Sequence, residues 1–217
     1  MLDRTSLTNG TFLNAFKDVP GLTLWSEERL ESSMRDILEQ RPTGQSVWIF
    51  AYGSLIWNPL FHFAESCPGV LHGWRRSFCM RLIAGRGCVR RPGRMMSLAS
   101  GGSTQGLALR IDEANLDAEL RIVWRREMLS GSYTPQWAPI DLQDGRRVHA
   151  IIFTANPACP LHEQDDSVQT VLPLIAKASG PLGSNRDYVI KLREALEQHS
   201  LDDPYISELA HQLQFAA

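Results

Sequence analysis

The chain has 217 residues, of which 43% are hydrophobic and 21% are charged, and its formal net charge is -2 at pH 7. This length allows one domain with a sizeable core, and the composition is that of a globular protein, not of a disordered or fibrous one. The near-neutral charge gives no reason to expect nucleic acid or an anionic membrane surface as a partner.

The first residues lack the basic and apolar regions of a signal peptide, and no window approaches the ~20 apolar residues that span a bilayer. The four cysteines are widely spaced, without a C-x-x-C motif or a short Cys/His pairing (Cys67, Cys79, Cys88 and Cys159). Such spacing argues against a zinc site or a disulfide framework. We therefore expect a cytoplasmic protein that has no metal site and no membrane partner.

Residues 1–44 are predicted to form an amino-terminal extension, and residues 45–217 the main domain. Ser26 is a suitable N-cap for a helix that ends before Pro42. Its apolar positions recur at helical spacing: Leu30, Met34, Ile37 and Leu38. The ten residues before Trp25 show no clear period and are expected to wrap the surface.

A block of strands follows the extension. Residues 47–52 are apolar and rich in β-formers, and residues 70–80 alternate in part. Residues 95–98 and 106–111 predict two further strands, joined through Gly101-Gly102. Next, Asp112 is placed to cap a helix that runs to about Met128.

Two more strands, residues 137–142 and 147–153, meet at Asp144-Gly145, which is typical of a hairpin turn. The last third of the chain is predicted to be helical. One helix covers residues 167–178, the next begins near Asn185 as its cap, and the last has Asp203 as its cap. Clustered strands with one inserted helix and several appended helices predict an α+β, barrel-like domain.

The first candidate site is the strand-to-loop stretch Tyr52-Gly53-Ser54-Leu55. A glycine after a buried strand lets the chain turn sharply, and successive N–H groups can then point into one concavity that binds carboxylates or an oxyanion. An ordinary turn remains an alternative. A nucleophilic role for Ser54 is disfavoured because no G-x-S-x-G motif surrounds it.

The second candidate is Glu127. It lies eleven residues after Leu116, close to three full helical turns, and so falls on the apolar stripe of the same helix. Burial would raise the pKa of its carboxyl group toward neutrality, as a general base requires. The alternatives are an ion pair with Arg125 or Arg126, or a helix end at which the carboxylate reaches water.

The third candidate is the segment of residues 86–94, in which four arginines, two glycines and a proline form a basic loop. Arg86 and Arg94 in such a loop are able to grip a carboxylate or a phosphate, although a solvated loop is equally compatible with the pattern. Cys88 lies among these positive charges, but no histidine is marked by its context as a partner base. Two tyrosines, Tyr133 and Tyr188, are compatible with either a core or a pocket position.

Read in order, these stretches resemble one family, the ChaC proteins. The resemblance covers the chain from about residue 47 onward, and four motifs carry it: residues 47–59, the glycine- and arginine-bearing segments of the basic loop, Arg126-Glu127-Met128 with Tyr133, and residues 178–188. One position departs from the family pattern, because Ala51 stands where the family usually has a glycine before the tyrosine.

The resemblance implies the γ-glutamylcyclotransferase fold, a mixed β-barrel flanked by helices, with glutathione as the substrate and no cofactor. It implies that Glu127 is the proton acceptor, and that Tyr188 lines the pocket. It also implies a γ-glutamyl-binding loop, which comprises Ala51, Tyr52, Gly53, Ser54, Leu55 and Ile56. Two alternatives stay open: the same reaction on another γ-glutamyl compound, and a non-catalytic γ-glutamyl-binding regulatory subunit.

Overall fold

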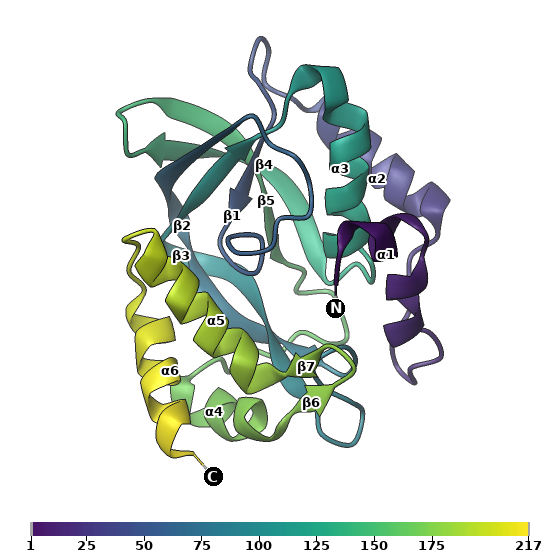
Figure 1. Ribbon diagram of the computed structural model, residues 1–217, viewed down its shortest axis with the longest axis vertical. Coiled ribbons are helices and arrows are strands. Elements are labelled where there is room, and N and C mark those ends of the chain that lie inside the picture. The colour runs from purple at the N-terminus through teal and green to yellow at the C-terminus, as the bar shows by residue number, and fades with distance from the viewer. Residues whose placement is uncertain (1, 217) are drawn as a thin grey trace.

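The computed structural model describes residues 2–216, and a closed five-stranded β-barrel lies at its centre (Figure 1). The strands lie in the order β1-β3-β2-β4-β5, and a parallel pairing of β1 with β5 closes the barrel. The other neighbours in this order pair antiparallel. Their bounds are Trp48–Ala51, Glu65–Leu82, Gly93–Arg110, Tyr133–Leu142 and Arg147–Ala155 for β1 to β5. The mixed barrel with flanking helices, predicted from the sequence, is confirmed.

The prediction of two strands at residues 95–98 and 106–111 is wrong, because β3 runs through both without a break. The register between β2 and β3 shifts between His72 and Trp74, opposite Gly101 and Gly102, whose φ angles are 97° and 70°. These glycines therefore form a bulge inside one long strand, not a turn between two strands.

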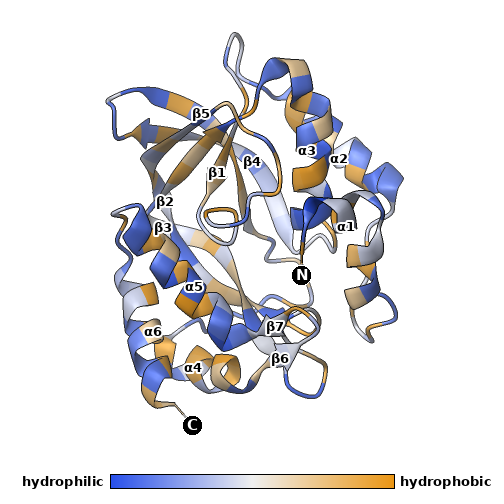
Figure 2. Cartoon of the chain, viewed as in Figure 1, coloured by the Kyte–Doolittle hydropathy of each residue, from blue (hydrophilic) through white to orange (hydrophobic). Residues whose placement is uncertain are grey.

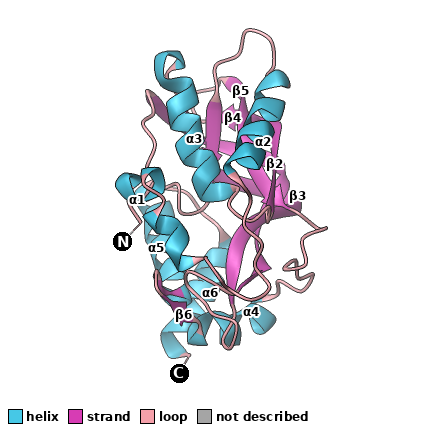
Figure 3. Cartoon of the chain, turned by 90° about the vertical axis from the view of Figure 1, so that its right-hand side faces the viewer, coloured by secondary structure: helices cyan, strands magenta, loops and turns pink. Residues whose placement is uncertain are grey.

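The helix α2 (Glu27–Glu39) has Ser26 as its N-cap, as predicted, and it packs against α3 (Leu116–Glu127) on one side of the barrel (Figure 3). A short 3-10 turn, η2 (Glu113–Asn115), precedes α3 and is capped by Asp112. Ahead of α2, the chain forms α1 (Arg4–Thr8) and a second 3-10 turn, η1 (Thr11–Ala15). The division of the chain at residue 44 stays a prediction.

Three helices, α4 (Val168–Lys177), α5 (Asn185–Gln198) and α6 (Pro204–Phe215), cover the part of the β2–β3 ribbon that extends beyond the barrel (Figure 1). Apolar and polar residues alternate along α5 and α6 (Figure 2), and the apolar residues Val189, Leu192, Ile206 and Leu209 are buried against the rest of the protein. A small hairpin of β6 (Ser179–Gly180) and β7 (Gly183–Ser184) leads into α5. The predicted cap at Asp203 is confirmed.

The predicted cap at Asn185 is wrong, because Ser184 caps α5 by accepting a hydrogen bond from the Asp187 N–H. The amide oxygen of Asn185 instead accepts from the backbone N–H of Arg94 at 2.8 Å. This buried contact ties the start of α5 to the start of β3. Within residues 2–216, no helix combines the length and the apolar character that crossing a bilayer requires.

Candidate active site

A cavity of about 590 Å³ opens between the end of α3, the strands of the barrel and the β6–β7 hairpin. This volume lies within the range of ~300–1,000 Å³ that small-molecule sites usually have. Six of the predicted site residues line it: Ser54, Arg86, Arg94, Glu127, Tyr133 and Tyr188. The fold thus brings together side chains from four segments that are distant in the sequence.

Glu127 is the last residue of α3, and its side chain is only 14% exposed. Its carboxylate lies 3.0 Å from the Nε of Arg126. Burial raises the pKa of the Glu127 carboxyl group, and the Arg126 charge opposes this rise. The inward position predicted from helical spacing is confirmed, and so is one of the alternatives, the pair with Arg126.

Arg126 connects the carboxylate to the loop after β1. Its guanidinium donates to the hydroxyl of Ser54 at 2.7 Å and to the backbone carbonyls of Asn58 and Pro59. The side chain is only 5% exposed, and burial lowers the pKa of its guanidinium. The sequence marked Arg126 only as a possible partner of Glu127. Its contact with Ser54 depends on tertiary structure and had no sequence signal.

The loop of residues 51–56 reaches the cavity through Ser54. The other members of the predicted binding loop lie buried behind the cavity wall: Ala51, Tyr52, Gly53, Leu55 and Ile56. Their role in binding stays a prediction, which concerns backbone N–H groups more than side chains.

A buried arginine fixes this loop from behind. The Nε of Arg76 donates to the Tyr52 carbonyl at 2.7 Å, while its other nitrogens reach the Gln105 carbonyl at 2.6 Å and the Asp203 carboxylate at 2.9 Å. Because a trans peptide directs its C=O and N–H to opposite sides, this contact orients the Gly53 N–H away from Arg76. The same arginine links the loop to the cap of α6.

Tyr188 approaches the loop closely at Gly53. A Cβ atom placed on Gly53 would lie 2.8 Å from the Tyr188 hydroxyl, so a larger residue would clash. The tyrosine ring stacks edge-to-face on Trp57, with centroids 5.4 Å apart. Burial and the Glu127 charge raise the pKa of Tyr188 to about 12, although the Arg126 charge and the Ser54 N–H lower it in part. Tyr188 is therefore a neutral hydroxyl at the cavity wall.

Two other tyrosines are engaged with the barrel. The hydroxyl of Tyr133 donates to the Met96 carbonyl at 2.7 Å, and that of Tyr52 to the Phe153 carbonyl at 2.5 Å. Burial raises the pKa of both phenols well above the usual value, so both stay protonated. Tyr133 thus lines the cavity with a ring whose hydroxyl already has a main-chain acceptor.

The basic loop is divided between the cavity and the solvent. Arg86 is half-buried and donates to the Ser184 carbonyl at 3.0 Å, whereas Arg94 is 6% exposed and lies 3.4 Å from Glu163. The Nε of Arg94 is buried without a hydrogen-bond partner among the described residues. Cys88 lies at an exposed turn of this loop. The two arginines that the sequence singled out lie in the cavity wall, and their role in binding stays a prediction.

The cavity is electropositive. Its lining includes five basic residues, and Glu127 is the one acid in the lining within residues 2–216. The basic residues are Arg81, Arg86, Arg94, Arg126 and Lys191. This balance suits an anionic ligand. In the same part of the chain, no cluster of histidine, cysteine and acidic side chains is arranged to hold a metal ion.

The amino-terminal residues also contribute to the cavity wall, which the sequence did not indicate. The residues concerned are Leu2, Phe12, Phe16 and Leu22. They precede the first clear helical period, and apolar residues without a period give no signal that they line a site.

Comparisons with known proteins match this architecture. A family model described as "ChaC-like protein" matches residues 47–215. The glutathione-specific gamma-glutamylcyclotransferase of Escherichia coli (strain K12) is 46% identical over 209 residues, which cover 96% of this chain and 90% of that protein. The human glutathione-specific gamma-glutamylcyclotransferase 1 is 27% identical over 157 residues, 70% of this chain and 71% of that protein.

Among solved structures, a gamma-glutamyl cyclotransferase specific to glutathione from yeast superimposes with a TM-score of 0.72. The match covers 79% of this chain and 97% of the yeast chain at 20% sequence identity. At this identity the likeness concerns the fold, and it places the barrel and its helices in one fold class with that enzyme.

Proposed function

The chain belongs to the family of ChaC-like proteins, and we propose that it converts glutathione into 5-oxoproline and Cys-Gly with Glu127 as the general base. It is a γ-glutamylcyclotransferase, an enzyme that closes the γ-glutamyl group on itself. The observation that carries the assignment of the base is the buried carboxylate of Glu127 in an otherwise electropositive cavity. A buried carboxylate is costly, and a site that only binds a ligand gains little from it.

The reaction is intramolecular, because the α-amine and the γ-amide carbonyl belong to the same glutamyl residue. The protein therefore has to fold the substrate back on itself and move protons. Glu127 accepts a proton from the α-ammonium group, and the neutral amine then attacks the γ-carbonyl carbon. The resulting tetrahedral intermediate collapses when the bond to the cysteinyl nitrogen breaks, and Glu127 returns its proton to that nitrogen. The attacking nitrogen still carries a second proton, which passes through Glu127 to the released amine, so the products are the neutral lactam and the Cys-Gly ammonium.

The environment of Glu127 sets its basicity. Burial raises the pKa of its carboxyl group, which makes it a better proton acceptor, while the positive charge of Arg126 opposes this rise. The N–H groups of residues 53–55 are the proposed donors to the oxyanion. In other enzymes one such donor contributes about 3 kcal/mol to transition-state stabilisation.

Arg86 and Arg94 are the proposed partners of the glycine carboxylate at the far end of the tripeptide. Both line the cavity, and a guanidinium group is well suited to bind a carboxylate. The electropositive wall matches a substrate that has two carboxylates and one ammonium group. A cytoplasmic location, and a role that involves neither nucleic acid nor membrane, belong to the same proposal.

Incubation of the purified protein with glutathione tests this function directly. We expect stoichiometric formation of 5-oxoproline and Cys-Gly, and a lower kcat/KM for γ-Glu-Ala, which lacks the glycine. Equal kcat/KM values for both substrates would indicate a cyclotransferase for γ-glutamyl compounds in general. Binding of glutathione without any product would favour the non-catalytic regulatory subunit instead.

A further inference from the structure

The amino-terminal residues 2–22, here called the strap, precede the region that matches the family model and still form part of the cavity wall. The strap contains α1 and η1, and its apolar side chains enter the protein. Leu7 and Phe12 are buried, and the ring of Phe16 meets that of Phe12 edge-to-face with centroids 4.8 Å apart. Such burial is expected of a wall, not of a loose tail.

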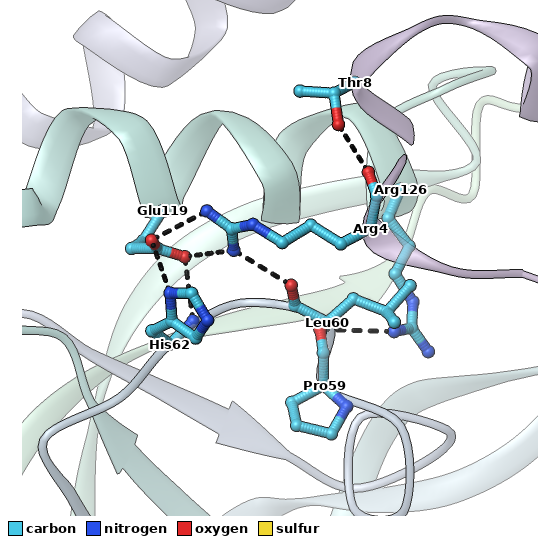
Figure 4. A network of polar contacts seen from close by, with 7 residues as sticks. All are labelled: Arg4, Thr8, Pro59, Leu60, His62, Glu119 and Arg126. Carbon is cyan, nitrogen blue, oxygen red and sulfur yellow. Dashed lines mark hydrogen bonds and ion pairs between the residues drawn. The ribbon is translucent and has the colours of Figure 1, made fainter. Parts of the chain in front are cut away.

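One end of the strap is fixed to the side of the cavity that holds Glu127 and its ion-pair partner Arg126. Arg4 makes a double contact with Glu119 of α3, at 2.6 and 2.8 Å, and also donates to the Leu60 carbonyl at 3.0 Å (Figure 4). Glu119 is buried and also accepts from the backbone N–H of His62 at 2.8 Å. A bidentate contact to a carboxylate held in place by a second donor positions α1 firmly.

Arg4 and Arg126 both donate hydrogen bonds to carbonyl groups of the same loop, residues 58–60. Figure 4 shows Arg126 approaching the 59–60 segment, and the Asn58 side chain reaches the Leu2 carbonyl at 3.3 Å. The start of the strap therefore lies next to the segment that Arg126, the ion-pair partner of Glu127, also contacts.

The other end of the strap lies against the basic loop. A Cβ placed on Gly85 would be 3.4 Å from the ring of Phe16 and 3.3 Å from Leu182, so these side chains pack directly on the Gly85 backbone. Arg86, the next residue, is a proposed partner of the glycine carboxylate. The strap thus extends from the side of the cavity that holds Glu127 to the side that holds Arg86.

We propose that the strap is a specificity element of this enzyme and that Phe16 contacts the Cys-Gly half of the substrate. This inference rests on the proposed function. An aromatic ring beside the carboxylate site buries the substrate's glycine methylene and its peptide unit, which a γ-glutamyl dipeptide does not have. Arg4 is a positioning residue that holds the strap against α3 and the 58–60 loop.

The test compares glutathione with γ-Glu-Cys, which differs only by the absence of glycine, in the full-length protein. The variant Phe16→Ala should lower kcat/KM for glutathione about tenfold, mainly through KM, and leave γ-Glu-Cys within about twofold of wild type. The matched control is Phe63→Ala, since Phe63 is 41% exposed and lies outside the cavity lining. It should leave both substrates unchanged.

An equal loss for both substrates, or no loss for either, would overturn the inference while wild-type turnover of glutathione still supports the proposed function. If the wild-type protein forms no 5-oxoproline from glutathione, the proposed function fails and this inference fails with it. The two failures are therefore distinguishable in one set of assays.

A second comparison tests the strap without altering its apolar side chains. Arg4→Met should accelerate amide hydrogen exchange throughout residues 2–22 and lower kcat/KM for glutathione in the same direction as Phe16→Ala. Arg41→Met is the matched control, because Arg41 likewise pairs doubly with a glutamate, Glu113, and donates to one carbonyl, but lies outside the cavity lining. Faster exchange in the strap with unchanged kinetics would contradict the proposal.

Discussion

Replacement of Glu127 by glutamine separates the catalytic role of this residue from its structural role. The amide has nearly the same shape as the carboxyl group, and its oxygen can occupy the same place beside Arg126, whose Nε lies 3.0 Å from the carboxylate. What the variant loses is the proton acceptor. General-base catalysis typically contributes 10²–10⁴-fold, which corresponds to a rise of about 3–5 kcal/mol in the activation barrier. We expect kcat for glutathione to fall by this factor.

The stability of the same variant follows from the pKa of Glu127. Burial raises that pKa above the unfolded value, so the carboxyl group favours the folded state when protonated, below the unfolded pKa, and this contribution is lost as pH rises through the folded pKa. Each unit of such a shift corresponds to about 1.4 kcal/mol. At neutral pH a neutral isostere removes this cost. Arg126 keeps three other acceptors after the substitution, one side-chain hydroxyl and two carbonyls. We therefore expect Glu127→Gln to be no less stable than wild type.

The assays are 5-oxoproline formation, calorimetric titration with glutathione and urea unfolding at pH 7. Glu28→Gln, an exposed position on α2, is the matched control and should change neither activity nor stability. Retention of more than about a tenth of the wild-type kcat by Glu127→Gln would refute the assignment of the base. A large loss of both stability and glutathione affinity would show instead that the carboxylate maintains the structure.

Four further predictions concern the surroundings of the base. Arg126→Met removes the positive charge that lowers the pKa of Glu127, so the acidic limb of the kcat/KM–pH profile should move to higher pH. An unmoved limb would mean that Arg126 does not set the pKa of Glu127. In Gly53→Ala the new Cβ would lie 2.8 Å from the Tyr188 hydroxyl and should displace it. We expect kcat/KM to fall at least about tenfold in the folded protein, and wild-type kinetics would contradict this crowding. Arg86→Ala and Arg94→Ala should raise KM for glutathione more than they lower kcat, whereas a pure kcat loss would place them in the chemical step. Cys88→Ser, and wild-type protein with a chelator, should keep the wild-type rate, and a thousandfold loss in either case would point to a nucleophilic or metal-assisted mechanism.

Local patterns predicted the parts of the site that depend on one element. The spacing of Leu116 and Glu127 on one helix placed the carboxylate inside, and α3 extends far enough for this to hold. Caps such as Ser26 and Asp203 were also readable, because a cap depends on residues three or four positions apart. The resemblance to a family added the roles of these residues, which no local pattern carries.

The contacts between elements were not predictable in the same way. The requirement for glycine at Gly53 is an example: its φ is not among the positive values found at other glycines, so the reason is the close approach of Tyr188 and not a special turn. Likewise, Gly101 and Gly102 read as a turn but form a bulge, since the choice depends on the partner strand. The strap gave no signal, because its apolar residues follow no period.

Ala51, the position that departs from the family pattern, shows how the structure answers a question that the sequence leaves open. The residue lies in β1, is completely buried, and stands behind the wall of the cavity, so its methyl group does not narrow the space for the substrate. The close backbone approach lies on the neighbouring strand. A Cβ on Gly106 would lie 2.5 Å from the Ala51 carbonyl oxygen and 2.7 Å from the ring of Phe50. Glycine is therefore needed on β3 more than at residue 51. The residue that follows Ala51 is held in place from another side, because the buried Arg76 donates to the Tyr52 carbonyl.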